Sequence, residues 1–138
     1  MQKILVVDDE PDIAELVSFN LQQDGFEVIT AATGWEAVEK ARAAHPDLIL
    51  LDLMLPELDG FAVCEMLRQL PATAAIPVIM LTAWTNEQSR ILGLELGAED
   101  YMTKPFSPRE LILRVHRVLA RVKDSADHNE RRIPRVAN

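Results

Sequence analysis

This chain of 138 residues has little cysteine, no long apolar run and no cluster of positive charge. Cys64 is the only cysteine, which excludes an intrachain disulfide framework and a thiolate cluster for zinc, so a reducing cytoplasm is the expected setting. No apolar run reaches the length of about 18 residues that a membrane-spanning helix needs. The first residues run into acidic positions too early to form a signal peptide.

Charge is distributed unevenly along the chain. The net charge is −8, yet residues 1–60 hold thirteen acidic and three basic residues, so the remainder is weakly basic. Binding to a nucleic-acid backbone requires clustered Lys and Arg, and the acidic first half therefore argues against direct nucleic-acid contact. The same acidity suits a cation site, although solubility alone explains most of these residues.

Short apolar runs alternate with amphipathic segments. Strands are predicted at residues 4–7, 28–30, 48–51, 76–81 and near 100–102. Helices are predicted around residues 13–21, 35–41, 61–67, 89–96 and 111–122. The first, third and fourth strands are apolar on both faces, as a parallel sheet covered by helices requires. The sequence therefore predicts an α/β fold of the (βα)5 type with right-handed crossovers.

Two local patterns refine this organisation. Thr33 and Glu36 have the spacing of a capping box, and the helix that they open is expected to turn Trp35, Val38 and Ala41 inward. After Val122 the apolar periodicity stops. We therefore expect a folded domain over residues 1–122 and a linker or disordered tail over residues 123–138.

Polar side chains follow four of the predicted strands, and in parallel sheets the carboxyl ends of the strands share one edge, where ligands bind. These residues are Asp8, Asp9 and Glu10 after the first strand, Asp52, Thr82 and Lys104. Clustered carboxylates repel one another unless a cation joins them, and Mg²⁺ is the usual one when a phosphoryl group completes its shell. Asp52 could then act as a nucleophile, with Lys104 neutralising phosphoryl oxygens and Thr82 donating a hydrogen bond.

Each of these residues also has a plainer interpretation. The acidic residues Asp8, Asp9 and Glu10 could cap the first helix, Thr82 could be an ordinary strand residue, and Lys104 could be solvated. Asp52 is harder to explain in this way, because a lone carboxylate at the end of an apolar run is costly to bury without a partner. The joint occurrence of all of them at one edge favours a site.

Five sequence motifs carry a resemblance to a known family. They read V-V-D-D-E at 6–10, L-L-D-L-M-L-P at 50–56, L-D-G at 58–60, L-T-A at 81–83 and G-A-E-D-Y-M-T-K-P-F at 97–106. This series resembles that of bacterial response-regulator receiver domains. The resemblance implies a flavodoxin-like, doubly wound five-stranded parallel sheet of order 2-1-3-4-5, with helices on both faces.

The resemblance also implies a function: a phosphorylation-activated signalling switch of a two-component system, and not a metabolic enzyme. Asp52 would accept a phosphoryl group from a sensor histidine kinase or a phosphotransfer protein. Asp8, Asp9, Asp52 and the backbone carbonyl of Met54 would bind Mg²⁺ or Mn²⁺. Lys104 would contact the phosphoryl group, and its bond to the following proline is cis in the family.

Further features of the family concern its output. Thr82 and Tyr101 would form the switch pair. The segment S-P-R-E-L at 107–111 is similar to receivers of the winged-helix transcription-factor subfamily, which dimerise through the fourth helix, fifth strand and fifth helix. The charged residues that match this pattern are Arg90, Glu95, Glu99, Asp100, Glu110, Arg114 and Arg121. We expect a weak homodimer, strengthened by phosphorylation, in either a free-standing receiver or one joined to a C-terminal effector domain.

Trp84 is bulky for a loop residue two positions after Thr82. One hypothesis makes it a lid that shields an acyl phosphate from water, and the alternative is an ordinary exposed aromatic residue.

Other classes of protein fit this sequence less well. A phosphatase or phosphomutase with an aspartyl nucleophile needs an acid where Met54 stands, and a flavin or nucleotide module needs a glycine-rich loop where D-D-E-P stands at 8–11. A degenerate receiver is disfavoured by the intact acidic residues.

Overall fold

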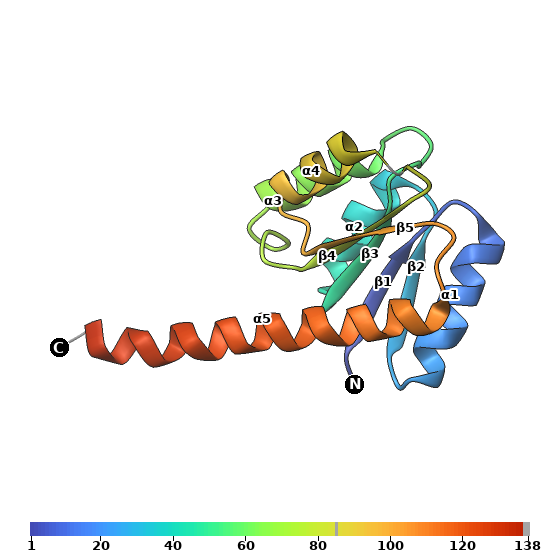
Figure 1. Ribbon diagram of the computed structural model, residues 1–138. Coiled ribbons are helices and arrows are strands. Elements are labelled where there is room, and N and C mark those ends of the chain that lie inside the picture. Colours follow the sequence, from blue (N-terminus) through green and yellow to red (C-terminus); the bar gives the residue numbers. More distant parts are fainter. Residues whose placement is uncertain (85, 137–138) are drawn as a thin grey trace.

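A computed structural model describes the backbone of residues 1–84 and 86–136, and the side chains of these residues as far as Asp124. Strands and helices alternate strictly along the chain (Figure 1). The strands are β1 (Lys3–Val7), β2 (Glu27–Ala31), β3 (Leu48–Asp52), β4 (Val78–Thr82) and β5 (Asp100–Thr103). The helices are α1 (Pro11–Gln23), α2 (Gly34–Ala44), α3 (Gly60–Gln69), α4 (Glu87–Glu95) and α5 (Pro108–Val136).

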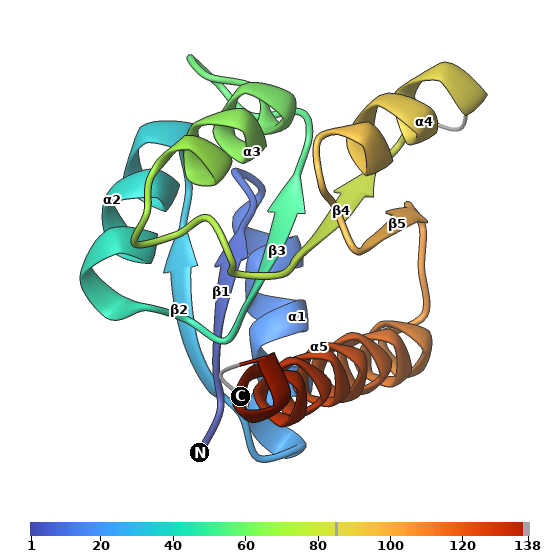
Figure 2. The ribbon, with the colours of Figure 1, turned by 90° about the vertical axis from the view of Figure 1, so that its left-hand side faces the viewer.

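The five strands form one parallel sheet of order β2-β1-β3-β4-β5, which confirms the predicted fold class (Figure 2). In the paired register, Val7 of β1 lies beside Leu51 of β3, and Asp52 lies beside Leu81 of β4. Every residue of β3 and β4 is buried. The register therefore places the carboxyl ends of β1, β3 and β4 together at one edge.

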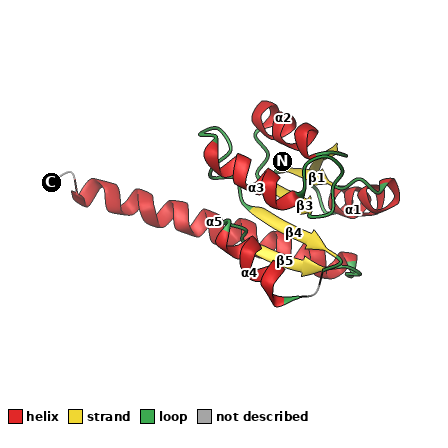
Figure 3. Cartoon of the chain, turned by 90° about the horizontal axis from the view of Figure 1, so that it is seen from above, coloured by secondary structure: helices red, strands yellow, loops and turns green. Residues whose placement is uncertain are grey.

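Helices cover both faces of the sheet, so the apolar strand residues divide into two cores. Leu5 and Val7 pack in one core with side chains of α2 and α3, while Ile4 and Val6 pack in the other with side chains of α1 and α5. This division follows from the strand geometry, in which successive side chains point to opposite faces. The view from above in Figure 3 shows α4 beside β5 at the edge of the sheet.

The predicted helix start at Thr33 is confirmed, because its side chain accepts a hydrogen bond from the Glu36 N–H at 3.1 Å. The prediction for Trp35 was wrong, since this side chain is 54 % exposed. The buried stripe of α2 consists of Gly34, Ala37, Val38 and Ala41. Trp35 follows the first of these by one residue, which turns it about 100° away from the stripe.

Among the boundaries that differ from those predicted, two have a clear physical cause. β4 begins at Val78 and not at Ile76, because Pro77 lacks the N–H that a central strand donates. α5 continues as helical backbone to Val136, where the loss of apolar spacing predicted a linker or tail. No glycine follows Gly97 in the sequence, and between Pro108 and Pro134 no residue breaks a helix. Residues 137–138 lie outside the described part of the chain.

None of the helices in residues 1–84 and 86–136 is long and apolar enough to cross a membrane.

Candidate functional site

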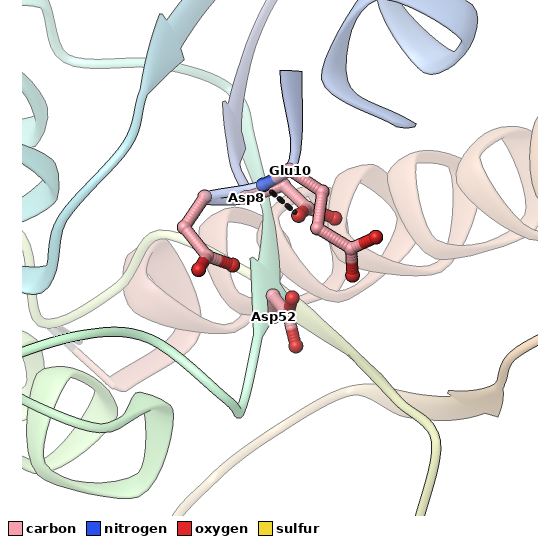
Figure 4. Close-up of side chains that lie close together, drawn as sticks. Asp8, Glu10 and Asp52 are labelled. Atoms are coloured by element: carbon pink, nitrogen blue, oxygen red, sulfur yellow. Dashed lines mark hydrogen bonds between the residues drawn. The ribbon is translucent and has the colours of Figure 1, made fainter. Parts of the chain in front are cut away.

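The predicted acidic residues of β1 and β3 meet at the carboxyl edge of the sheet. Asp8 directly follows β1, and Asp52 is the last residue of β3. One carboxylate oxygen from each of Asp8, Asp9, Glu10 and Asp52 lies within 4.8 Å of the others. Figure 4 shows Asp8 and Glu10 beside Asp52. Asp8 is 4 % exposed and Asp52 is 2 % exposed, whereas Asp9 and Glu10 face solvent.

Backbone amides orient the two buried carboxylates. Asp8 Oδ1 accepts a hydrogen bond from the Glu10 N–H at 2.9 Å, and Asp52 Oδ1 accepts one from the Met54 N–H at 3.0 Å. The Asp8 N–H donates in turn to the Ala31 carbonyl at 3.1 Å, which ties the end of β1 to β2. The Oδ2 atoms of both carboxylates face the space beyond the carboxyl ends of the two strands, where they share one partner.

Lys104 enters that space from the segment after β5. Its ammonium donates to Asp8 Oδ2 and to Asp52 Oδ2, at 3.0 Å in each case, and lies 3.8 Å from a carboxylate oxygen of Glu10. The main chain at this point is fixed as well, because the Lys104 N–H donates to the Thr82 carbonyl at 2.6 Å. The bond from Lys104 to Pro105 is cis, as the family resemblance implied.

The electrostatics of the site follow from burial and from this ammonium. Burial raises the pKa of Asp52, although the Met54 N–H and the Lys104 ammonium act in the opposite direction. Burial alone would lower the pKa of Lys104, but the hydrogen bonds to Asp8 and Asp52 outweigh it and raise that pKa. Four carboxylates face one ammonium, so the pocket has an excess of negative charge. Its oxygen donors suit a hard divalent cation.

The predicted switch residues lie beside this pocket. Thr82, at the end of β4, is fully buried, and its Oγ1 accepts a hydrogen bond from the Trp84 N–H at 3.0 Å. Tyr101, on β5, is also buried, and its hydroxyl donates to the Trp84 carbonyl at 3.1 Å. Burial raises the pKa of the Tyr101 phenol. The Tyr101 side chain is thus an inward residue of β5, and its hydroxyl is paired with the main chain of the loop after β4.

Trp84 and Met54 differ in their surroundings. The Trp84 ring is partly buried and stacks on Phe61 at the start of α3, with ring centroids 6.1 Å apart and planes 24° from parallel. The Met54 side chain is 53 % exposed. Glu10 was expected in the acidic run after the first strand, but it was given no role as a ligand. Phe61 was not assigned to the site, because nothing in the sequence pairs it with Trp84.

The charged residues predicted for an interface lie on α4, β5, α5 and the turn before β5. Arg114 donates to Asp100 Oδ1 at 3.1 Å and to a Glu110 carboxylate oxygen at 3.0 Å, so these three residues pair within one copy of the chain. Arg90 and Arg121 are exposed, as is Glu95, and Glu99 is partly buried. Arg90, Glu110 and Arg114 line a polar hollow over Tyr101 and Thr103.

Comparison with known proteins identifies the class to which this fold and acidic edge belong. The family model described as the response regulator receiver domain matches residues 4–116. The transcriptional regulatory protein PhoP of alkaline phosphatase synthesis in Bacillus subtilis is 54 % identical over 129 residues, which cover 94 % of this chain and 53 % of that protein. The DNA-binding dual master transcriptional regulator RpaA of Synechocystis is 47 % identical over 133 residues, with 94 % and 55 % covered.

A solved structure agrees with these relatives. The receiver domain of a response regulator from Francisella superposes with a TM-score of 0.82 at 36 % identity, and the match covers 88 % of this chain and 98 % of that one. The chain spans about half the length of the curated relatives that it matches. It belongs to the response-regulator receiver family of two-component systems, whose general function is a phosphorylation switch.

Proposed function

We propose that Asp52 of this chain is the phosphoacceptor of a two-component signalling pathway in the cytoplasm. The donor is a phosphohistidine on a sensor histidine kinase or a phosphotransfer protein. One observation carries the proposal: Lys104 lies 3.0 Å from the buried carboxylates of both Asp8 and Asp52. Burying two carboxylates and an ammonium together costs desolvation energy. Such a cluster at the end of a sheet is typical of a functional site, and here it would bind a phosphoryl group and a cation.

The chain provides the ligands for Mg²⁺ or Mn²⁺, namely the carboxylates of Asp8, Asp9 and Asp52 and the backbone carbonyl of Met54. Carboxylate and carbonyl oxygens are the ligands that these hard ions prefer, and the acidic cluster matches this preference. When bound, the metal would neutralise charge on the transferring phosphoryl oxygens. The ion would also offset the repulsion that accompanies ionisation of Asp52.

The receiver then catalyses its own phosphotransfer through positioned side chains. A carboxylate oxygen of Asp52 attacks phosphorus, the bond from phosphorus to the imidazole nitrogen breaks, and the electron pair remains on the histidine. Lys104 places its ammonium where negative charge accumulates, and the Thr82 hydroxyl donates to a phosphoryl oxygen. Hydrolysis of the resulting acyl phosphate returns Asp52 to its free carboxylate and resets the switch.

The test uses intact mass spectrometry after treatment with a small phosphodonor, with and without Mg²⁺. Wild-type protein is expected to gain one phosphoryl group only when the metal is present. Asp52→Asn is expected to gain none, because an amide cannot form the acyl phosphate. Asp59→Asn is a matched control, since Asp59 caps α3 and is not part of the acidic cluster. Equal phosphorylation of wild type and Asp52→Asn would disprove the assignment.

The output of the switch is a change on the face formed by α4, β5 and α5. We assign Thr82 and Tyr101 as the switch pair, and the seven charged residues named above as the dimer face. In this proposal residues 1–122 form the receiver, and residues 123–138 form a connection to a C-terminal effector of the transcriptional type. The transcriptional relatives, which extend beyond the matched region, support this arrangement.

Dimer formation is expected to increase with phosphorylation. Exposed ion pairs contribute only about 0–1 kcal/mol each, so the dimer should be weak and its register set by charge. Sedimentation velocity should show a larger dimer fraction with Mg²⁺ and a beryllofluoride phosphate mimic than without the mimic. Equal dimer fractions in the two conditions would contradict the proposal.

Trp84→Ala is expected to shorten the half-life of the phosphorylated protein. An indole near the strand ends restricts the approach of water to the acyl phosphate, and alanine does not. The measurement follows loss of the phosphoryl mass over time after removal of the donor. Trp35→Ala serves as the control, because Trp35 is 54 % exposed on α2. An unchanged half-life in Trp84→Ala would exclude a shielding role.

A further inference from the structure

Trp84 makes three contacts that join separate parts of the molecule. Its N–H donates to Thr82 Oγ1 at 3.0 Å, and its carbonyl accepts from the Tyr101 hydroxyl at 3.1 Å. Its ring stacks on Phe61 of α3. The main chain of Trp84 therefore connects both members of the switch pair, while its side chain contacts α3.

Phe61 is attached to the part of the chain that carries Asp52. The Gly60 N–H donates to the Leu53 carbonyl at 3.0 Å, and the carboxylate of Asp59 caps α3 by accepting from the Ala62 N–H at 2.9 Å. A Cβ atom built on Gly60 would lie 2.6 Å from the Asp52 carbonyl oxygen, so α3 begins in direct contact with the end of β3. The backbone that carries Phe61 is thus held against the end of β3, and the ring contacts Trp84 in the loop after β4.

We infer that Phe61 is a positioning residue for the phosphorylation switch, and that its ring holds the main chain of Trp84 against Thr82 and Tyr101. The inference rests on the proposed roles of Thr82 and Tyr101 and adds a residue that acts through them. The Trp84 N–H occupies one acceptor position of the Thr82 hydroxyl, and the hydroxyl keeps a hydrogen that it can donate to a phosphoryl oxygen. The Trp84 carbonyl keeps the Tyr101 ring inside. Loss of the stack should therefore loosen both contacts together.

The composition of the chain provides two specific optical probes. Tyr101 is the only tyrosine, so the change in ultraviolet absorbance on phenol ionisation comes from this residue alone. The chain has two tryptophans, and Trp35→Phe leaves Trp84 as the only indole emitter. Both measurements use the unphosphorylated protein, and they report on the stack whether or not Asp52 is the phosphoacceptor.

In the Trp35→Phe background, Phe61→Ala is expected to lower the pKa of Tyr101 toward the ordinary phenol value of about 10, because the hydroxyl loses the burial that raises its pKa. Quenching of Trp84 emission by acrylamide should increase. Phe61→Tyr should keep the wild-type quenching of Trp84, since it retains the ring; its added phenol excludes it from the Tyr101 titration. Phe61→Leu should change the Tyr101 pKa and the Trp84 quenching in the same directions as Phe61→Ala. If the alanine variant does not fold, the leucine variant provides the test.

Phe19→Ala is the matched control, because Phe19 is a 58 % exposed phenylalanine on α1. It should leave the Tyr101 titration and the Trp84 quenching unchanged. Unchanged values in Phe61→Ala and Phe61→Leu would overturn the inference. So would a Phe61→Leu variant that matches wild type in both measurements, because an apolar filler would then suffice in place of an aromatic ring.

A third measurement links the stack to phosphorylation. With a small phosphodonor and Mg²⁺, Phe61→Ala is expected to slow phosphorylation by about threefold through misplacement of Thr82. Trp84→Ala removes the same stack, so the double variant should be no slower than the slower single variant. Multiplicative effects would show two independent roles and would overturn the inference. If wild type is not phosphorylated on Asp52, the proposed function fails, while the two optical measurements still decide the role of Phe61.

Discussion

Replacing Lys104 with methionine is expected to slow phosphorylation of Asp52 by a small phosphodonor by about a hundredfold or more. Methionine is similar in length but carries no charge. The variant therefore lacks the ammonium that lies 3.0 Å from both Asp8 and Asp52 and that would neutralise phosphoryl oxygens. The rate is measured by intact mass at fixed Mg²⁺ and donor concentrations.

The same substitution should destabilise the metal-free protein. Breaking a buried ion pair by removing one partner costs about 3 kcal/mol at neutral pH, and the Lys104 side chain is only 13 % exposed. Since the pKa of Asp52 is already raised in the folded state, the folded protein binds this proton more tightly than the unfolded chain. The free energy of unfolding should therefore fall as the pH rises from about 4 through the folded pKa, and more steeply without Lys104.

Mg²⁺ should restore part of the lost stability, because the metal replaces the missing positive charge. Lys40→Met is the control for both measurements, since Lys40 forms a half-exposed pair with Glu36 on α2. A Lys104→Met variant with a wild-type rate would remove this residue from the phosphoryl site. A wild-type free energy of unfolding would show that the buried carboxylates do not depend on its charge.

The second large effect is expected for Gly60→Ala. A Cβ atom at this position would lie 2.6 Å from the Asp52 carbonyl oxygen and 2.7 Å from the Leu53 Cα, and both are backbone atoms at the end of the buried strand β3. Backbone there cannot move without disturbing the sheet, so we expect a destabilisation of about 3 kcal/mol. The measurement is the urea midpoint at constant slope.

Gly25→Ala provides the matched comparison. Gly25 has a φ of +93°, yet a Cβ there would meet nothing within 4 Å, so only the conformational penalty of about 1 kcal/mol remains. Comparing the two variants distinguishes destabilisation caused by a steric clash of Cβ with neighbouring backbone from destabilisation caused by a positive φ. If Gly60→Ala unfolds at the same urea concentration as wild type, α3 does not depend on contact with the end of β3.

The sequence was sufficient to predict the parts of the site that follow from topology. Asp8 and Asp52 come after apolar strand runs, and parallel strands bring such positions to one edge whatever the details of the loops. Lys104 follows the same logic from β5. The short apolar runs of the strands and the helix cap at Thr33 depend on neighbouring residues only. They could therefore be predicted from short stretches of sequence.

Other features depend on contacts between distant segments, which the sequence does not encode locally. The stack of Phe61 on Trp84 depends on the path of a loop 23 residues further along the chain. Val38 and Ala41 lie on the buried stripe of α2 as predicted, and only the packing shows that Gly34 and Ala37, and not Trp35, complete that stripe. The extent of α5 was missed because loss of apolar spacing marks the end of burial, not the end of a helix.

The length of α5 has a mechanical consequence. Its first turns pack in the core through Leu111, Val115 and Val118, Leu119 and Val122 pack against that core, and the rest of the helix extends away from the sheet (Figure 1). At 1.5 Å per residue, the stretch from Val122 to Val136 is about 21 Å long. A rod of this length is a lever arm, so a tilt of about 10° at its base would move the far end through about 4 Å. A small rotation at the core would thereby become a larger displacement at the tip.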